Sequence, residues 1–313
     1  MKREDRELSM HLKDDDKRLF EGWYIKITDP KISLAIIIGI SKTIEESYAF
    51  IQTLDTYTNQ SQMLEYPLEA FTWGNEPFYL QLGDNLFTKD KVVLKLDEGS
   101  VFIQGTINLG PLTKLTTSLY APTIMGPFAY LAKRVCNHGI ISLKHDVNGT
   151  ININGETLSI NGIGYLEKDW GQSFPASYLW LQSNVCKEHD ANIFLSVADV
   201  ALMKCSFKGV IMTLLVEQQQ YHLASYYGAY VKDKFIKEGY YYLIIKQWAY
   251  TFYFKIKPGN SVLLKAPQFG KMSESVEECL DALIVLLVYK HNQRVAKFSF
   301  TNCGLELFGD LFD

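Results

Sequence analysis

The sequence predicts an all-β protein built from antiparallel barrels or sandwiches. Aromatic residues make up 13% of the 313 residues, with 19 Tyr and 18 Phe, and this abundance favours strands. Short apolar or alternating segments recur between clusters of Gly, Pro, Asn and Asp, which is the pattern of strands joined by turns. A hydrophobic content of 47% with 21% charged residues is typical of globular proteins, and the length allows one large or two ordinary domains.

The first half of the chain supplies predicted strands in regular succession. Residues 33–41 are almost wholly apolar, which indicates a strand buried on both faces. Residues 45–46 and 83–85 carry charged or glycine-containing turns. The predicted strands in this half cover residues 23–27, 33–41, 48–55, 78–82, 92–96 and 101–109.

The segment 110–140 interrupts this rhythm because it is irregular and rich in proline. We expect one or two helical turns at 128–135, which would close the end of a barrel or line a pocket mouth. A meander of three strands follows, at residues 140–146, 149–153 and 158–165. Asn148-Gly149 and Asn154-Gly155 both have the composition of two-residue hairpin turns.

The second half echoes the first, since strands starting at Tyr178, Asn192 and Phe207 resemble the three that open the chain. Further strands are predicted at 224–231, 239–247 and 250–256, and then a strand pair at 282–288 and 295–301 with a short helical lead-in from Ser273. The predicted organisation is a polar arm (1–19), a first β-domain (20–160) and a second β-domain (161–313).

The stretch from Gly162 to Val185 concentrates the chemistry-bearing side chains. Successive side chains of a strand point to opposite faces, so Tyr165, Glu167 and Asp169 should share one face. In the next predicted strand, one face holds the residues Tyr178, Trp180, Gln182 and Asn184. A surface of carboxylates, rings and amides suits a pocket for a largely apolar ligand with a few polar anchors. The alternative is that the acids are solvated turn residues and the tryptophans are core.

The same stretch resembles the tocopherol cyclase family. The residues that carry the resemblance are Glu167-Lys168-Asp169-Trp170-Gly171, Phe174-Pro175 and the W-x-Q-x-N of Trp180, Gln182 and Asn184. Further similar motifs occur in chain order: Phe20-Glu21-Gly22-Trp23-Tyr24, Gly126-Pro127-Phe128, Cys136-Asn137-His138-Gly139 and Gly304-Leu305-Glu306. Tyr178 stands where the family pattern would have a tryptophan.

The resemblance implies two lipocalin-like β-barrels in tandem, each with room for a small ligand. It also implies ring closure of a prenylated quinol to a chromanol, without a cofactor. That reaction needs a proton donor for an alkene and aromatic faces to stabilise the carbocation. It also needs a dry cavity that holds the prenyl chain of the substrate in a reactive conformation.

The sequence offers a candidate for each of these roles. Asp169 or Glu167 is the candidate acid, with Glu21 a more distant third. The candidate substrate-binding residues are Trp23, Tyr24, His138, Trp170, Tyr178, Trp180, Gln182 and Asn184, with Gln182 and Asn184 orienting the ring hydroxyls and His138 as a proton shuttle. The alternatives are that Glu167 and Lys168 form an exposed charge pair, that Trp23 and Trp170 are core, and that His138 is structural.

Several classes of function are disfavoured. A net charge of −4 argues against a nucleic-acid partner. The five cysteines are scattered without a C-x-x-C pair, so we expect neither disulfides nor a metal site but a reducing, cytoplasmic setting. We expect no signal peptide or membrane helix, while peripheral membrane contact and the oligomeric state stay open.

Three hypotheses follow for the function. The first is a cyclase or related isomerase acting on a prenylquinol or other isoprenoid lipid. The second is a hydratase of isoprenoid double bonds, which needs the same buried acid and admits water. The third is a non-catalytic binder of a lipophilic small molecule.

Overall fold

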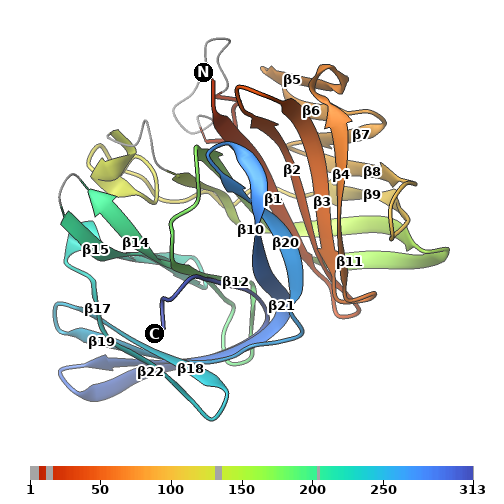
Figure 1. The fold of residues 1–313 in the computed structure, drawn as a ribbon. Helices are drawn as coiled ribbons and strands as arrows, with labels where there is room; N and C mark the ends of the chain where they lie inside the picture. Colours follow the sequence, from red (N-terminus) through yellow and green to blue (C-terminus); the bar gives the residue numbers. More distant parts are fainter. Residues whose placement is uncertain (1–6, 12–16, 131–135, 203–204, 313) are drawn as a thin grey trace. The chain divides into compact units, whose positions relative to one another are not determined.

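The structure is a computed structural model that describes residues 7–11, 17–130, 136–202 and 205–312 (Figure 1). It is almost entirely antiparallel β-sheet, and the prediction of lipocalin-like antiparallel barrels in tandem is confirmed. Contacts divide the chain into two compact units. The first comprises Met1–Phe174 with Leu264–Ser275, and the second comprises Pro175–Leu263 with Val276–Asp313. The sequence-based boundary between residues 160 and 161 falls inside a strand of the first unit.

The first unit contains one antiparallel sheet in the order β4-β3-β2-β1-β11-β10-β9-β8-β7-β6-β5. Its central strands are therefore β1 and β11, which are far apart in the sequence. The strands are β1 (Leu19–Thr28), β2 (Ser33–Lys42), β3 (Ser47–Asp55), β4 (Gln60–Pro67), β5 (Phe71–Asn75), β6 (Phe78–Leu82), β7 (Asn85–Thr88), β8 (Lys91–Leu96), β9 (Ile103–Leu109), β10 (Asn137–Ile153) and β11 (Glu156–Gly171). As expected from its apolar sequence, β2 is buried along nearly its whole length.

The second unit holds most of the other sheet, in the order β16-β15-β14-β12-β22-β21-β19-β18-β17. Strands β13 and β20 pair with β22 and β21 beside this path. The strands are β12 (Tyr178–Ser183), β13 (Val185–Cys186), β14 (Ala191–Leu202), β15 (Cys205–Val216), β16 (Gln219–Ala224), β17 (Tyr230–Lys237), β18 (Tyr240–Gln247), β19 (Tyr250–Lys257), β20 (Val262–Gln268), β21 (Lys271–Lys290) and β22 (Gln293–Phe308).

Each unit has a core formed by the apolar side of its own strands. In the first unit, Ile25, Ile36 and Ile151 are among the buried residues of this core. In the second unit, Phe254 and Leu286 are among the buried residues of the core. Alternation along the strands separates these side chains from the outward ones, so each sheet has one continuous apolar face.

The structure corrects the predicted turn at Asn148-Gly149, which lies within β10. Glycine is needed there for a different reason, because a Cβ on Gly149 would collide with the carbonyl oxygen of Thr106 on the neighbouring strand. The hairpin turn is Asn154-Gly155, where both residues have positive φ angles of 52° and 90°, as a type I′ turn requires.

Two further predictions of secondary structure were wrong in detail. The helical lead-in at Ser273 is absent from the described structure, because β21 is a continuous strand from Lys271. The expected strand at 224–231 is interrupted by the 3-10 turn η4 (Ser225–Tyr227) and by Gly228 in the left-handed conformation. The helical turn expected at 128–135 appears as the 3-10 turn η3 (Gly126–Tyr130), and residues 131–135 lie outside the described part.

The described part of the N-terminal arm is more apolar in its contacts than its composition suggests. Leu8 and Met10 are buried, and the Trp23 Nε1 atom donates a hydrogen bond of 2.9 Å to the Leu8 carbonyl oxygen. Residues 7–11 therefore pack against the core of the first unit. The described helices are short 3-10 turns, and none is long and apolar enough to cross a membrane.

Candidate acid–base site

The alternation of side chains along β11 creates two different clusters on its two faces. Tyr165, Glu167 and Asp169 project to one face, and Leu166 and Lys168 project to the other. Antiparallel pairing with β10 sets His138 opposite Asp169, and pairing with β1 sets Tyr24 opposite Glu167.

The first face carries a chain of hydrogen-bonding groups centred on His138. The His138 Nδ1 atom lies 2.8 Å from Asp169 Oδ1, and its Nε2 atom lies 3.4 Å from Glu167 Oε2. The Tyr165 hydroxyl donates a hydrogen bond to the same oxygen of Glu167. Glu167 and Tyr165 are buried, whereas the Asp169 side chain is 20% exposed. The imidazole therefore links a deep carboxylate to a more accessible one.

The electrostatics of this cluster place a proton on the imidazole at neutral pH. Burial by itself lowers the pKa of His138, but Asp169 and then Glu167 favour the protonated form and raise the pKa to about 9. Burial raises the pKa of the Tyr165 phenol well above its usual value, and Glu167 raises it further. The phenol therefore remains protonated and is available as a hydrogen-bond donor.

This arrangement can store and move a proton. The Glu167 carboxylate can accept a proton from Nε2 of His138, and Asp169 can stabilise the imidazole through Nδ1. The ligand atoms of Glu167, Asp169 and His138 also lie within 4.8 Å of one another, which is close enough for the three residues to bind one cation. However, the carboxylates approach different nitrogens of the ring, and this geometry fits a proton relay better than one shared ion.

The opposite face of β11 holds a buried ion pair between Lys168 and Glu21. Both side chains are at most 1% exposed, and the Lys168 ammonium also contacts His11 Nδ1 at 2.8 Å. It lies 4.4 Å from the centre of the Trp23 ring and 5.1 Å from that of Trp170. Lys168 is thus a structural cation within the core, and the alternative of an exposed charge pair with Glu167 is wrong.

Two residues that the sequence predicts as pocket walls lie next to this ion pair and not next to the acids. Trp23 and Trp170 lie beside Lys168, on the face of β11 opposite to Glu167 and Asp169. Burial raises the pKa of Glu21, but Lys168 and His11 outweigh this and hold it below the usual value. A carboxylate kept ionised in this way is poorly suited to donate a proton, so Glu21 is a weaker candidate for the acid than Glu167 or Asp169.

Tyr24 is the predicted aromatic residue that lies on the same face as the acids. It is buried and directly opposite Glu167 in the strand register. Lys26, also buried, follows on this face of β1, opposite Tyr165. The acid cluster therefore has an aromatic and a cationic neighbour from β1.

The remaining predicted residues belong to β12 and to the segment after it, in the second unit. Gln182 Nε2 donates a hydrogen bond to Asn184 Oδ1, as expected for residues sharing a face. The Tyr178 hydroxyl donates a hydrogen bond of 3.0 Å to Glu306 Oε2, and Trp180 is buried. The acid group thus lies in the first unit and the amide group in the second.

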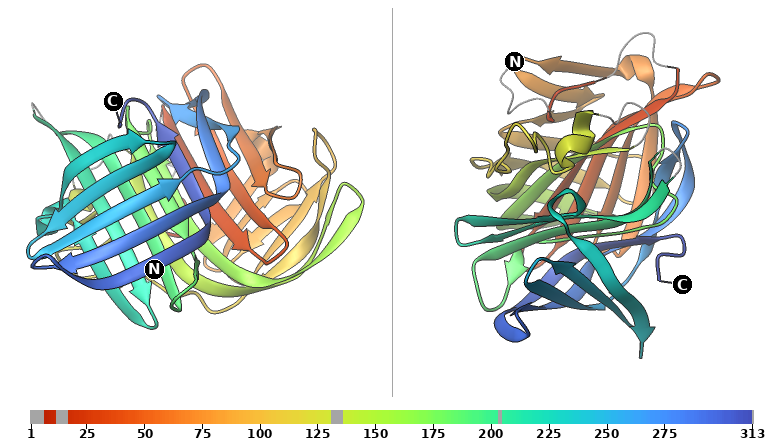
Figure 2. Two further views of the ribbon diagram at one scale, coloured as in Figure 1. Left: turned by 90° about the horizontal axis from the view of Figure 1, so that it is seen from below. Right: turned by 90° about the vertical axis from the view of Figure 1, so that its left-hand side faces the viewer.

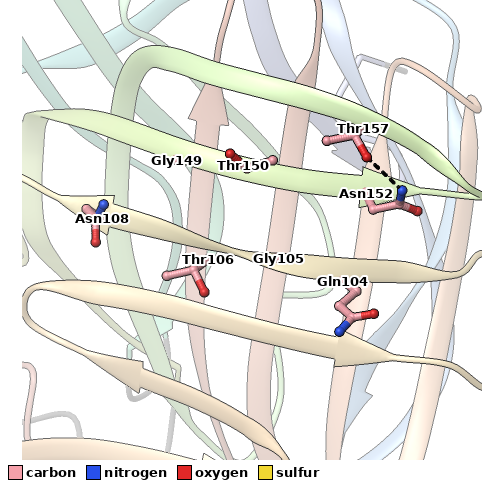
Figure 3. Close-up of a pocket in the computed structure, with 8 residues that line it drawn as sticks. All are labelled: Gln104, Gly105, Thr106, Asn108, Gly149, Thr150, Asn152 and Thr157. Atoms are coloured by element: carbon pink, nitrogen blue, oxygen red, sulfur yellow. Dashed lines mark hydrogen bonds between the residues drawn. The ribbon is translucent and has the colours of Figure 1, made fainter.

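A shallow groove of about 500 Å³ lies on the outer side of β9, β10 and β11 (Figure 3). Its lining contains only neutral polar side chains and glycine, so it has no group that could donate a proton to an alkene. Its residues are Gln104, Gly105, Thr106, Asn108, Gly149, Thr150, Asn152 and Thr157. The buried cluster around His138 is therefore the better candidate for acid–base chemistry.

Sequence reasoning missed some members of the two clusters for different reasons. Tyr165 was placed on the correct face but was given no role, although its spacing of two residues from Glu167 is a visible signal. The contact of Lys168 with Glu21 and His11 left no comparable signal, because it depends on the pairing of β1 with β11 and on the docking of residues 7–11.

Comparisons with known proteins yield matches in structure. No family model and no curated protein sequence matches the chain. A protein assigned as AttH (NE1406) from Nitrosomonas europaea aligns with a TM-score of 0.57 and 12% identity, over 95% of this chain and 94% of that one. CghA in complex with Sch210972 aligns with a TM-score of 0.58 and 10% identity, over 94% and 89%.

Kievitone hydratase from Nectria haematococca also aligns, with a TM-score of 0.50 and 12% identity, over 94% of this chain and 89% of that chain. At such low identities these matches show a shared fold across nearly the whole chain. They support the lipocalin-like architecture and do not assign the chain to the tocopherol cyclase family.

Proposed function

We propose that this protein is a cofactor-independent acid–base enzyme that acts on a carbon–carbon double bond of a lipophilic, isoprenoid-type substrate. The reaction we favour is the cyclisation of a prenylated quinol. The observation that carries the proposal is the chain of contacts from Tyr165 through Glu167 and His138 to Asp169. A protein of the same fold is named kievitone hydratase, and a cyclase differs from a hydratase in adding a phenol oxygen in place of water.

In the proposed mechanism, the proton held by His138 passes from Nε2 to Glu167, whose carboxyl group then protonates the alkene. A new C–H bond forms and the double bond becomes a tertiary carbocation. The phenol oxygen attacks this carbon, a C–O bond forms, and the phenolic proton returns to Glu167. The substrate is therefore isomerised with no net gain or loss of protons.

The surroundings of Glu167 suit this chemistry. Glu167 and Tyr165 are buried, and burial favours the neutral form of a carboxyl group, as alkene protonation requires. The ring of Tyr24, opposite Glu167 in the register, is positioned to present an aromatic surface to a cation on this face. Asp169 acts as a positioning residue because it holds the imidazole through Nδ1, with Nε2 lying 3.4 Å from Glu167 Oε2.

The test is incubation of the purified protein with a prenylated hydroquinone, followed by mass spectrometry of the product. We expect the product to be an isomer of the substrate. In deuterated water, the hydrogen added to the former alkene carbon should be a deuterium. Glu167→Gln removes the proton donor and should reduce turnover by about 100-fold or more. Asp169→Asn should reduce it by a smaller factor, because the relay keeps its donor.

Asp146→Asn is the matched control, since Asp146 is an exposed carboxylate on the same strand as His138. It should leave turnover unchanged. Addition of the mass of one water would identify a hydratase instead. Binding of the quinol without conversion, unaffected by Glu167→Gln and Asp169→Asn, would remove the acid cluster from the function and leave a lipid binder.

A further inference from the structure

The outward face of β17, β18, β19 and β21 carries apolar and aromatic side chains among its lysines, where a solvent-facing sheet would normally be more polar. On β19 the buried residues Phe252, Phe254 and Ile256 alternate with exposed Tyr253, Lys255 and Lys257. On β21, Leu283 is 43% exposed, and Leu287 and Tyr289 follow on the same side. The register sets Tyr253 opposite Leu287, so these side chains form one continuous surface.

Aromatic contacts hold this surface in a fixed arrangement. Phe235 stacks on Tyr242 with ring centres 4.8 Å apart, and Tyr253 meets Tyr289 edge to face at 5.2 Å. Lys255 lies 4.0 Å from the centre of the Tyr240 ring. The strands that carry these residues are drawn in cyan to blue in Figure 2. Ordered aromatic rings offer a large amphipathic contact area at little entropic cost.

The charge of this surface is opposite to that of the whole chain. Residues 230–257, which span β17 to β19, contain six lysines and two acidic residues, whereas β21 contains two lysines and four acidic residues. Together these segments carry a net charge of +2, against −4 for the whole protein. Lys246, Lys255 and Lys257 lie on the outward side, where long side chains can extend their ammonium groups beyond the rings. Tyrosines and lysines over an aliphatic base are the combination that binds the headgroup region of a membrane.

We infer that the outward face of β17, β18, β19 and β21 is a docking surface for an anionic lipid bilayer. The excess of lysine provides the electrostatic attraction, and Tyr253, Leu283 and Leu287 provide apolar contact with the headgroup boundary. A second copy of the chain is disfavoured as the occupant, because a two-fold interface would bring the same positive surface against itself. The inference does not depend on the acid chemistry, since all of its residues lie outside the cluster around His138.

The experiment is co-sedimentation of the full chain with vesicles of phosphatidylcholine alone and of phosphatidylcholine with phosphatidylserine. We expect binding to the anionic vesicles, little binding to the neutral ones, and release as the salt concentration rises. Lys255→Gln with Lys257→Gln should weaken binding by about 10-fold or more, since each lysine near the surface contributes roughly a fivefold effect. Leu283→Ser with Leu287→Ser should weaken it at constant charge.

The matched control is Lys31→Gln with Lys91→Gln, which removes the same charge from exposed positions of the first unit. This variant should bind like the wild type, and an equal loss of binding would overturn the assignment to this face. Failure to bind anionic vesicles would also overturn it. Binding to soluble poly-glutamate tests for an acidic protein partner in place of lipid. If the chain bound poly-glutamate as tightly as anionic vesicles, and Leu283→Ser with Leu287→Ser did not weaken that binding, the proposal would be contradicted.

Turnover of detergent-dispersed quinol keeps the two proposals distinguishable. The variants of the docking face should convert dispersed substrate like the wild type while losing conversion of vesicle-bound substrate. Glu167→Gln should show the reverse pattern, with normal vesicle binding and low turnover in both preparations.

Discussion

At the scale of single residues, His138 is a group of the candidate site whose ionisation depends strongly on its neighbours. Burial opposes its protonated form, but Asp169 and Glu167 favour that form more strongly and raise the pKa from 6.5 to about 9. A pKa that is higher in the folded state contributes stability that is fully present below pH 6.5. This contribution is lost as the pH rises through about 9.

His138→Gln should therefore be most destabilising at pH 6 and progressively less so towards pH 9.5. The difference in the free energy of unfolding between wild type and variant should shrink by on the order of 1–3 kcal/mol across this range. Urea unfolding at several pH values measures it. Lys168, whose pKa burial lowers to about 8 despite the opposing effect of Glu21, is present in both proteins and cancels in the difference. A difference that is independent of pH would contradict the assigned ionisation.

At the scale of elements, β11 is a strand with two chemically distinct sides. One side carries the relay of Glu167 and Asp169, and the other side, which faces the core of the first unit, carries Lys168 paired with Glu21 of β1. A buried ion pair contributes little net stability, but removal of one partner leaves an uncompensated charge inside the protein. The pair thus enforces the pairing of β1 with β11, on which the position of Tyr24 opposite Glu167 depends.

Lys168→Met should lower the free energy of unfolding by roughly 3–5 kcal/mol, because Glu21 would remain buried without its partner. The double variant with Glu21→Gln should recover part of this loss. Lys95→Met removes an ion pair with Asp84 in which both side chains are exposed to solvent. This substitution should leave the free energy of unfolding unchanged within error. Equal effects of Lys168→Met and Lys95→Met in chemical denaturation would exclude a special role for the buried pair.

At the scale of the whole molecule, the chain forms two compact units that each have a core of their own. Ile36 in β2 and Leu286 in β21 are fully buried representatives of these cores. Strands that share a core should lose their protection together when that core is weakened.

Leu286→Ala should destabilise the second unit by about 2–5 kcal/mol and accelerate amide hydrogen exchange first in β18, β19 and β22. Ile36→Ala should act first on β1 and β3. Hydrogen exchange followed by mass spectrometry measures both effects. If each substitution accelerated exchange equally throughout the chain, the two cores would belong to one cooperative unit.

The sequence by itself determined the β class, most strand positions and the alternation that sets Tyr165, Glu167 and Asp169 on one face, because these depend on local patterns with a period of two residues. The sequence pattern at Asn148-Gly149 wrongly predicted a turn. Gly149 is needed there because neighbouring strands approach each other closely, and a turn would have required glycine as well.

Only the tertiary structure decided which strands are neighbours. His138 meets Asp169 from a position 31 residues earlier, and Lys168 contacts the carbonyl oxygen of Ser9 from 159 residues away. Such contacts depend on the register between strands, which is set by packing of the whole sheet and leaves no trace in either local sequence. For the same reason, the tryptophans at 23 and 170 read as pocket walls in the sequence and lie beside a buried lysine in the fold.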